Sequence, residues 1–229
     1  VVLGILEDGE LHEYTLGGAP IKVDPVRYEM MDSVGYIKAE NFDARSAEQM
    51  IAACEALIAE GAEGLVFDMR FNRGGQVDEL LKILDYILPK GDIFLSRVKG
   101  GEMEIDRSDA KCLEMPMAVL VNERSYSAAE FFAAALQEYE WATVVGVQTT
   151  GKGYAQSTVT LSDGSAVHIS VKEYFTPKGV SLAGVGIAPD IAVDIDNDSW
   201  MELYYDILDP ANDPQLQAAL TVIKEAATE

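Results

Sequence analysis

The sequence predicts a domain of the α/β class, for three reasons. From residue 34 onward, strand-like and helix-like segments alternate along the chain. The segment GLVFDMR at 64–70 is apolar without interruption through Phe67, as is typical of a strand buried on both faces of a parallel sheet. The chain has 229 residues, of which 48% are apolar, so it can bury a substantial core.

Residues 1–23 do not follow this alternation. VVLGIL and LHEYTL have the composition of two short strands around the turn EDGE, and GGAPIKV follows as a linker. A two-stranded hairpin is marginally stable by itself. Two interpretations are therefore open: an edge ribbon of the main domain, or the remnant of a second module.

The predicted core spans residues 24–195, and its first long strand is VGYIKAENF at 34–42. A helix follows that starts at Ser46, the first residue of a capping-box pattern, and stops at Gly61, because glycine favours helix C-termini. After the buried strand comes the turn FNRGG. The apolar spacing of VDELLKILDYIL then predicts a helix over 77–88.

The second half of the core contains three more predicted strands, IFLSRV, MAVLVN and ATVVGV, with a polar excursion after the first. A helix is expected from about Ser127 to Glu140. After the loop QTTGKGYAQ, the alternating segment 157–176 predicts a β-hairpin around Asp163 and Gly164. The last segment, 196–229, predicts two acidic surface helices, DSWMELYYDIL and DPQLQAALTVIKEA.

The net charge limits the classes of function. The formal charge is −22, from 17 Lys and Arg against 39 Asp and Glu, so the surface repels phosphate backbones and anionic lipids. No apolar run approaches 18 residues, and VVLGILEDGE has no basic flank. We therefore expect no nucleic-acid partner, no membrane insertion and no signal peptide in this sequence.

Three loops that follow predicted strands carry residues suited to chemistry. Ligand sites in α/β sheets gather at the carboxyl ends of the strands. The loops are Asn72-Arg73-Gly74-Gly75, Ser125-Tyr126-Ser127-Ala128 and Thr150-Gly151-Lys152-Gly153. A catalytic site would require all three to meet.

Ser127 has two interpretations. Ser127 and Glu130 have the spacing of a capping box, in which the hydroxyl accepts a hydrogen bond from an early helix amide. The same position puts the positive end of the helix beside the hydroxyl, which would favour an oxyanion there. At this point the residue is a cap, a nucleophile, or both.

A nucleophilic serine needs a base. His12 and His168 have no motif context for that role, whereas Lys152 lies between two glycines in a loop. A desolvated lysine amine can accept a serine proton, although an exposed turn lysine is the simpler interpretation. The glycines at 74 and 75 would let backbone amides approach a ligand closely, or would only form a tight turn.

In order, these pieces resemble the C-terminal processing peptidases, or tail-specific proteases, which are serine endopeptidases with a Ser-Lys dyad. The matching segments, within about residues 30–195, are GYIKAENF, GLVFDMRFNRGG, VLVNERSYSAAEFFAAAL, VVGVQTTGKGYAQ and YFTPKGVSLAGVGIAPDIAV. Each motif is weak by itself, but five in the family's order with family-like gaps make a specific pattern.

The resemblance implies a role for each candidate site residue. Ser127 would be the nucleophile and Lys152 the base, and Gln156 would orient the lysine amine. The oxyanion hole would pair the amide of Ala128 with that of Gly74 or Gly75. Two departures from the family pattern are Arg73, in place of a proline, and Tyr126, in place of a small residue beside the nucleophile.

The resemblance also implies a fold, a substrate class and a location. The fold would be related to the crotonase and Clp-protease families, with repeated strand-strand-helix units, and residues 1–23 would be a partial PDZ-like hairpin and linker. The substrates would be extended or unfolded polypeptides, cleaved near their C-termini by an exported or cell-envelope enzyme. No metal or cofactor is implied. The rival interpretation is a non-catalytic protein of the same fold that binds peptides or apolar ligands.

Overall fold

The protein is described by a computed structural model covering residues 1–19, 21 and 23–227. Positions 20 and 22 of the predicted linker and 228–229 of the predicted C-terminal segment lie outside the described residues. The fold is of the mixed α/β class, as the alternating pattern predicted.

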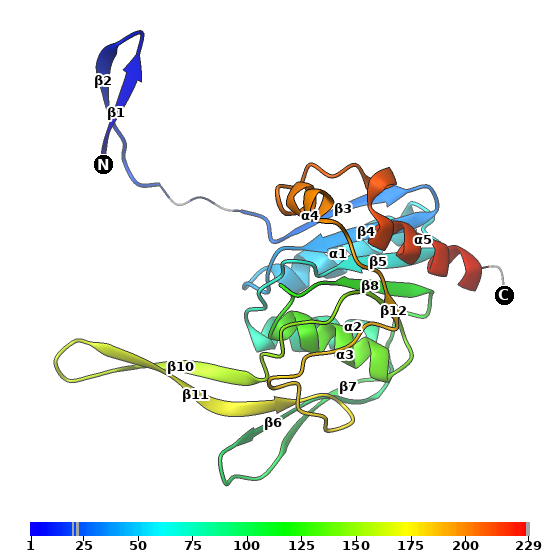
Figure 1. The fold of residues 1–229 in the computed structure, drawn as a ribbon. Helices are drawn as coiled ribbons and strands as arrows, with labels where there is room; N and C mark the ends of the chain where they lie inside the picture. Colours follow the sequence, from blue (N-terminus) through cyan, green and yellow to red (C-terminus); the bar gives the residue numbers. More distant parts are fainter. Residues whose placement is uncertain (20, 22, 228–229) are drawn as a thin grey trace.

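Within the described residues, the main sheet has six strands in the order β12-β9-β8-β5-β4-β3 (Figure 1). Their bounds are β3 (Val26–Met31), β4 (Val34–Ala39), β5 (Gly64–Asp68), β8 (Met117–Val121), β9 (Thr143–Gly146) and β12 (Ile191–Ala192). β3 is antiparallel to β4, and the other neighbouring pairs are parallel. The carboxyl ends of β4, β5, β8 and β9 therefore share one edge of the sheet.

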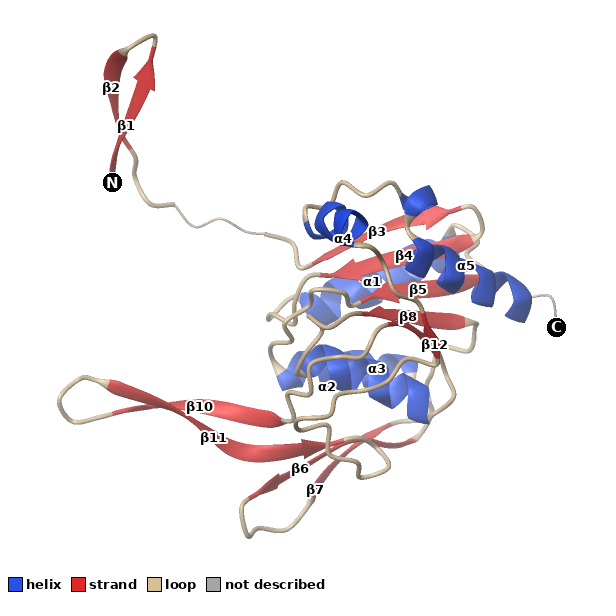
Figure 2. Ribbon diagram, in the orientation of Figure 1, coloured by secondary structure: helices blue, strands red, loops and turns tan. Residues whose placement is uncertain are grey.

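Three helices cover one face of this sheet (Figure 2). They are α1 (Ser46–Ala59), α2 (Val77–Ile87) and α3 (Ala128–Glu138). On β5, Leu65 and Phe67 join the core beneath these helices, whereas Val66 joins a second apolar cluster on the opposite face. The prediction that this strand is buried on both faces is confirmed, because successive side chains of a strand point to opposite faces.

The helix α5 (Pro214–Ala226) covers the opposite face of the sheet. Leu216, Ala219 and Ile223 are buried against it, and a Cβ added to Gly64 would lie 2.3 Å from Ile223 Cγ2. One face of α5 is exposed, as expected of a surface helix, but its apolar stripe, which was not identified from the sequence, completes the second core. The short helix α4 (Asn197–Tyr204) buries only Leu203 among its described residues.

A second sheet extends from the body of the protein. It contains β6 (Gly91–Val98), β7 (Glu104–Ser108), β10 (Tyr154–Thr160) and β11 (Ala166–Phe175) in the order β10-β11-β6-β7. The hairpin β10-β11 was predicted, but β7 lies in the segment predicted as a polar excursion. Its side chains are mostly exposed, so the strand has no apolar alternation to reveal it.

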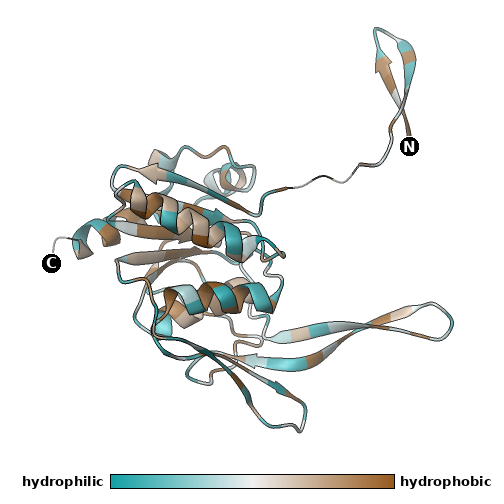
Figure 3. Ribbon diagram, turned by 180° about the vertical axis from the view of Figure 1, so that it is seen from behind, coloured by the Kyte–Doolittle hydropathy of each residue, from teal (hydrophilic) through white to brown (hydrophobic). Residues whose placement is uncertain are grey.

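The predicted amino-terminal hairpin is present as β1 (Val2–Glu7) and β2 (Glu10–Thr15). Every residue of both strands is exposed, and the hairpin lies away from the main sheet (Figure 1). It nevertheless carries hydrophobic residues (Figure 3), among them Leu6, which is 73% exposed. Among the described residues, no helix is both long and apolar enough to cross a bilayer.

Candidate active site

The turn after β5 is built around Asn72. The buried Asn72 side chain donates from Nδ2 to the Ala39 carbonyl at 2.8 Å and accepts the Gly74 amide at Oδ1, also at 2.8 Å. Gly74 has φ +78°. A Cβ added there would lie 2.7 Å from Ser127 Cβ and 2.8 Å from the Ala128 nitrogen. Glycine is required because the turn touches the start of α3 backbone to backbone.

Two backbone amides in this region have no acceptor among the residues that the structure describes. Because the Gly74 amide is engaged by Asn72, it is not available to a ligand. Among the hydrogen bonds of the described residues, none uses the amide of Gly75 or Ala128 as a donor. Gly75 also permits close approach, since an added Cβ would lie 2.1 Å from the Phe42 carbonyl oxygen. The two segments that meet at Gly74, the turn after β5 and the start of α3, therefore each have one backbone amide that is available to a ligand.

Ser127 precedes α3 in an unusual backbone conformation, with φ +58° and ψ −127°. Positive φ is uncommon outside glycine, and such strained residues are concentrated at functional sites. The preceding amide, that of Tyr126, donates to the Asn72 carbonyl at 3.1 Å. This bond joins residues 125–128, the Ser127 loop, to residues 72–75, the glycine turn.

The carboxylate of Glu130 joins the Ser127 loop to the Lys152 loop. Glu130 is fully buried. Its Oε2 accepts the Ser127 amide at 2.9 Å and the Lys152 amide at 2.8 Å. Its Oε1 accepts the Gly151 amide and the Thr149 hydroxyl, each at 2.6 Å. The S-x-x-E spacing predicted a link between Glu130 and Ser127 at the start of the helix. Nothing local in the sequence indicated the hydrogen bonds that Glu130 accepts from the amides of Gly151 and Lys152.

The glycines beside Lys152 are explained by a neighbouring loop. The Gly184 amide donates to the Gly151 carbonyl at 2.8 Å. A Cβ added at Gly151 would lie 2.7 Å from the Val185 nitrogen, and one at Gly153 would lie 2.7 Å from the Ala183 nitrogen. The Lys152 loop is therefore packed between Glu130 and residues 183–186.

The Lys152 amine lies beside the residue that precedes Ser127. Its Nζ is 5.6 Å from the centre of the Tyr126 ring. Within the described part of the chain, Nζ makes no hydrogen bond or ion pair, with Ser127 Oγ or any other group. The structure thus brings Lys152 and Ser127 into neighbouring loops without a direct bond between their side chains.

Gln156 lies farther along, on β10. Its Oε1 is 3.2 Å from Nε2 of His168 on the neighbouring strand, and His168 Nδ1 is 2.9 Å from the Thr158 hydroxyl. The side chain of Gln156 is therefore engaged with His168, not with Lys152. Of the six candidate residues, five lie on the three loops that meet, and Gln156 lies outside them.

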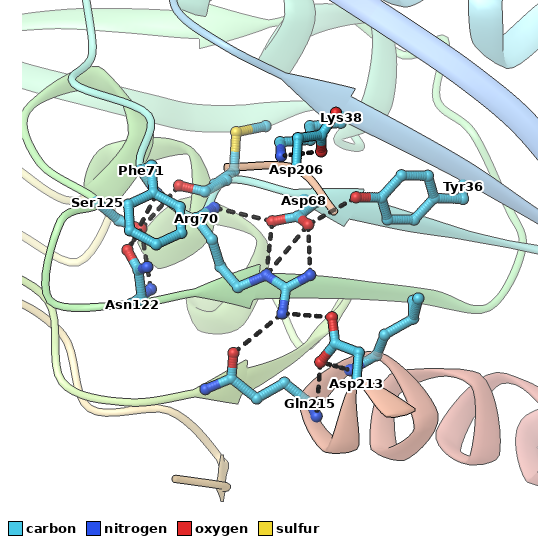
Figure 4. Close-up of polar contacts among 12 residues, drawn as sticks. Tyr36, Lys38, Asp68, Arg70, Phe71, Asn122, Ser125, Asp206, Asp213 and Gln215 are labelled. Carbon is cyan, nitrogen blue, oxygen red and sulfur yellow. Dashed lines mark hydrogen bonds and ion pairs between the residues drawn. The ribbon is translucent and has the colours of Figure 1, made fainter. Parts of the chain in front are cut away.

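Sequence reasoning missed a buried charged network behind the glycine turn (Figure 4). Arg70 is 2% exposed and Asp68 is fully buried. The Arg70 Nη2 lies 2.6 Å from Asp68 Oδ2, and its Nη1 lies 2.7 Å from Asp213 Oδ2 and 3.1 Å from Gln215 Oε1. Tyr36 donates its hydroxyl to Asp68 at 2.7 Å. The sequence signal that could have indicated this network is the pair of charged residues, Asp68 and Arg70, at the end of an apolar strand.

Electrostatics keep this network charged. Burial by itself would raise the pKa of Asp68, but the adjacent Arg70 guanidinium outweighs it and holds the pKa below its ordinary value. Burial and the Asp68 carboxylate both raise the pKa of Tyr36, so its hydroxyl stays protonated as a donor. The network connects the base of the glycine turn to the start of α5.

Comparison with known proteins identifies related chains. The model of Peptidase family S41 matches residues 33–193. A carboxyl-terminal-processing protease of Synechocystis is 35% identical over 217 residues, which cover 92% of this chain and 50% of the relative. A carboxy-terminal-processing protease of Bartonella bacilliformis is 34% identical over 182 residues, covering 76% and 42%.

Solved structures with the same fold include peptidases. A photosystem II D1 C-terminal processing protease superposes with a TM-score of 0.69 at 28% identity, over 80% of this chain and 52% of that one. A putative S41 protease from Bacteroides fragilis has a TM-score of 0.74 at 18% identity, over 98% and 65%. The chain spans about half the length of the curated relatives it matches, 50% and 42% of the two named above.

Proposed function

The chain belongs to peptidase family S41, and from this premise we propose that it is a serine endopeptidase that cleaves extended polypeptides near their C-termini through a Ser-Lys acyl-enzyme mechanism. One observation carries the proposal. A single buried carboxylate, that of Glu130, binds the backbone of both the nucleophile and the base, beside two acceptor-free amides.

In this mechanism, Lys152 acts as a free amine and takes the proton from Ser127 Oγ. The oxygen attacks the carbonyl carbon of the scissile bond, and the amides of Ala128 and Gly75 bind the resulting oxyanion. The tetrahedral intermediate collapses, the amine leaving group takes the proton from Lys152, and an acyl-enzyme forms. Water then attacks the ester carbonyl, giving its proton to Lys152, and the carboxylate product leaves as Ser127 is reprotonated.

The mechanism requires movement of two side chains. Lys152 Nζ must leave the Tyr126 ring to reach Ser127 Oγ, and catalytic hydrogen bonds commonly tighten only when substrate binds. Gln156 must leave His168 if it is to orient the amine. Both side chains have room to change rotamer, since Lys152 is half-buried and Gln156 is exposed.

The finer assignments of fold and location belong to the same proposal. The core is proposed to be crotonase-like and related to Clp proteases. The hairpin β1-β2 is proposed to be part of a PDZ-like module, which its exposed apolar side chains support. By family analogy, the protein is proposed to act outside the cytoplasm or in the cell envelope.

The test is cleavage of an unfolded polypeptide, such as reduced and alkylated casein. We expect the wild-type chain to cleave it, and Ser127→Ala and Lys152→Ala to lower the rate by about a thousandfold or more. Lys178→Ala, at an exposed lysine in another loop, is the matched control and should cleave normally. Equal cleavage by all four proteins would contradict the dyad. Tight peptide binding without any cleavage would favour the non-catalytic alternative.

A further inference from the structure

A large cavity opens beside the predicted nucleophile. Its volume is about 1000 Å³. Tyr126, which directly precedes Ser127, lines it, as do Arg73 from the glycine turn and Arg124 from the Ser127 loop. A group bound in this cavity would therefore contact the residue that directly precedes the predicted nucleophile.

The acidic residues of the cavity already have basic partners. Asp206 forms a two-point ion pair with Arg27 and lies 3.2 Å from Lys38 Nζ. Glu40 lies 3.7 Å from Arg27 Nε. The charges of Asp206, Glu40 and Lys38 are thus largely compensated within this group.

The two arginines of the cavity have no such partner in the described part of the chain. Both Arg73 and Arg124 are exposed, and neither guanidinium makes a hydrogen bond or an ion pair with any residue that the structure describes. Two uncompensated guanidinium groups beside the nucleophile are notable in a chain with a net charge of −22. A guanidinium presents a planar set of donors that matches a carboxylate in two-point hydrogen bonding.

Another part of the cavity lining is aromatic. The ring of Phe71 lies edge-on to Trp200 at 5.2 Å and to Tyr204 at 5.5 Å, and the rings of Trp200 and Tyr204 stack at 5.6 Å. All three residues line the cavity. Trp200 Nε1 also donates to Glu123 at 2.7 Å, which holds α4 against the site. This wall offers a fixed apolar surface to a large side chain.

We propose that this cavity binds a substrate carboxylate that adjoins a large apolar or aromatic side chain, with Arg73 and Arg124 as specificity-determining residues. The inference rests on the peptidase function proposed above. The carboxylate has two sources in a peptide: the free C-terminus, or the side chain of an aspartate or glutamate.

Matched peptides separate these sources. One pair has an aromatic C-terminal residue with a free acid or an amide, and a second, amidated pair carries glutamate or glutamine beside the same aromatic residue. We expect kcat/KM to be about tenfold or more higher for a carboxylate peptide than for its neutral partner. The loss of a hydrogen bond to a charged group changes a binding constant by about this factor. The pair that shows the difference identifies the source.

Three variants test the residues. Arg73→Gln and Arg124→Gln should each reduce the preference for the carboxylate peptide. Arg107→Gln removes the same charge on β7, where the side chain pairs with Asp92, and should keep the preference. Circular dichroism and thermal unfolding establish that each variant is folded.

Binding provides a readout that does not depend on catalysis. The acid and amide peptides are titrated into Ser127→Ala, and tryptophan fluorescence reports their dissociation constants. Equal dissociation constants for both members of both pairs would overturn the carboxylate subsite, even if the wild-type chain is an active peptidase. Preferential binding of a carboxylate peptide without any hydrolysis by the wild type would support the subsite and contradict the peptidase function.

Discussion

The Oε2 atom of Glu130 accepts the backbone amide of Lys152 at 2.8 Å. The same atom accepts the Ser127 amide. One buried carboxylate therefore holds the loop of the proposed nucleophile beside the loop of the proposed base. Four donors converge on Glu130, and none of them carries a positive charge. We treat Glu130 as a positioning residue, because its side chain acts through the backbones of Ser127 and Lys152.

Replacing Glu130 with glutamine should separate the two loops. An amide group supplies N–H where an acceptor is needed, so at least one buried donor loses its partner, at a cost of about 1–3 kcal/mol in unfolding free energy. We expect a lower urea midpoint together with a fall in kcat larger than any change in KM. Glu48→Gln is the matched control, because Glu48 is exposed at the equivalent position of α1. Unchanged kcat in Glu130→Gln would refute the positioning role.

Gly74→Ala should impair both stability and catalysis. The added Cβ would press on the backbone of the Ser127 loop, in addition to the cost of left-handed φ. Gly179→Ala is the control, since Gly179 has φ +77° and no atom within 4 Å of an added Cβ. That variant should lose only about 1 kcal/mol of unfolding free energy, the cost of the left-handed conformation. Gly74→Ala should lose more and should also hydrolyse peptides more slowly; equal losses would argue against the close approach.

Tyr126→Ala should release the Lys152 amine from the aromatic ring. A cation-π contact at a partly exposed site contributes about 0.5–1 kcal/mol, so we expect kcat to rise about two- to fivefold. Tyr126→Phe retains a ring at this position and should behave as the wild type. Single-turnover acylation is the appropriate measurement, because it isolates the step in which the amine takes the proton. Slower acylation in Tyr126→Ala would mean that the ring positions the amine productively.

The Asp68–Arg70 network should make stability depend on pH. The folded-state pKa of Asp68 is held below the ordinary value of 3.8, so the unfolded chain binds more protons in that range. The stabilisation is complete above 3.8 and is lost as the pH falls through the folded-state pKa. Urea unfolding between about pH 6 and pH 3 should show stability falling with acid, with a shallower slope in Asp68→Asn. Asp198→Asn, at an exposed residue of α4, should keep the wild-type slope.

Much of the candidate site could be predicted from the sequence. Glycines 74 and 75 predicted a close backbone approach or a tight turn, and the apolar strand at 64–70 placed that turn at the edge of the sheet. The contact between Gln156 and His168 could not be predicted, because a bulge between Ala155 and Gln156 shifts the register of β10 against β11. A one-residue shift changes the face to which a side chain points.

Patterns within short stretches of the chain established the order of most strands and helices, although not β3, β7 or β12, together with the burial of β5 and the positions of the three loops. Those properties follow from local periodicity and turn chemistry, which act over a few residues. The link from Glu130 to Lys152, the pairing of Arg70 with Asp213 and the packing of α5 came only from the folded arrangement. Such contacts join residues far apart in the chain, and their geometry depends on how the layers pack rather than on any nearby sequence.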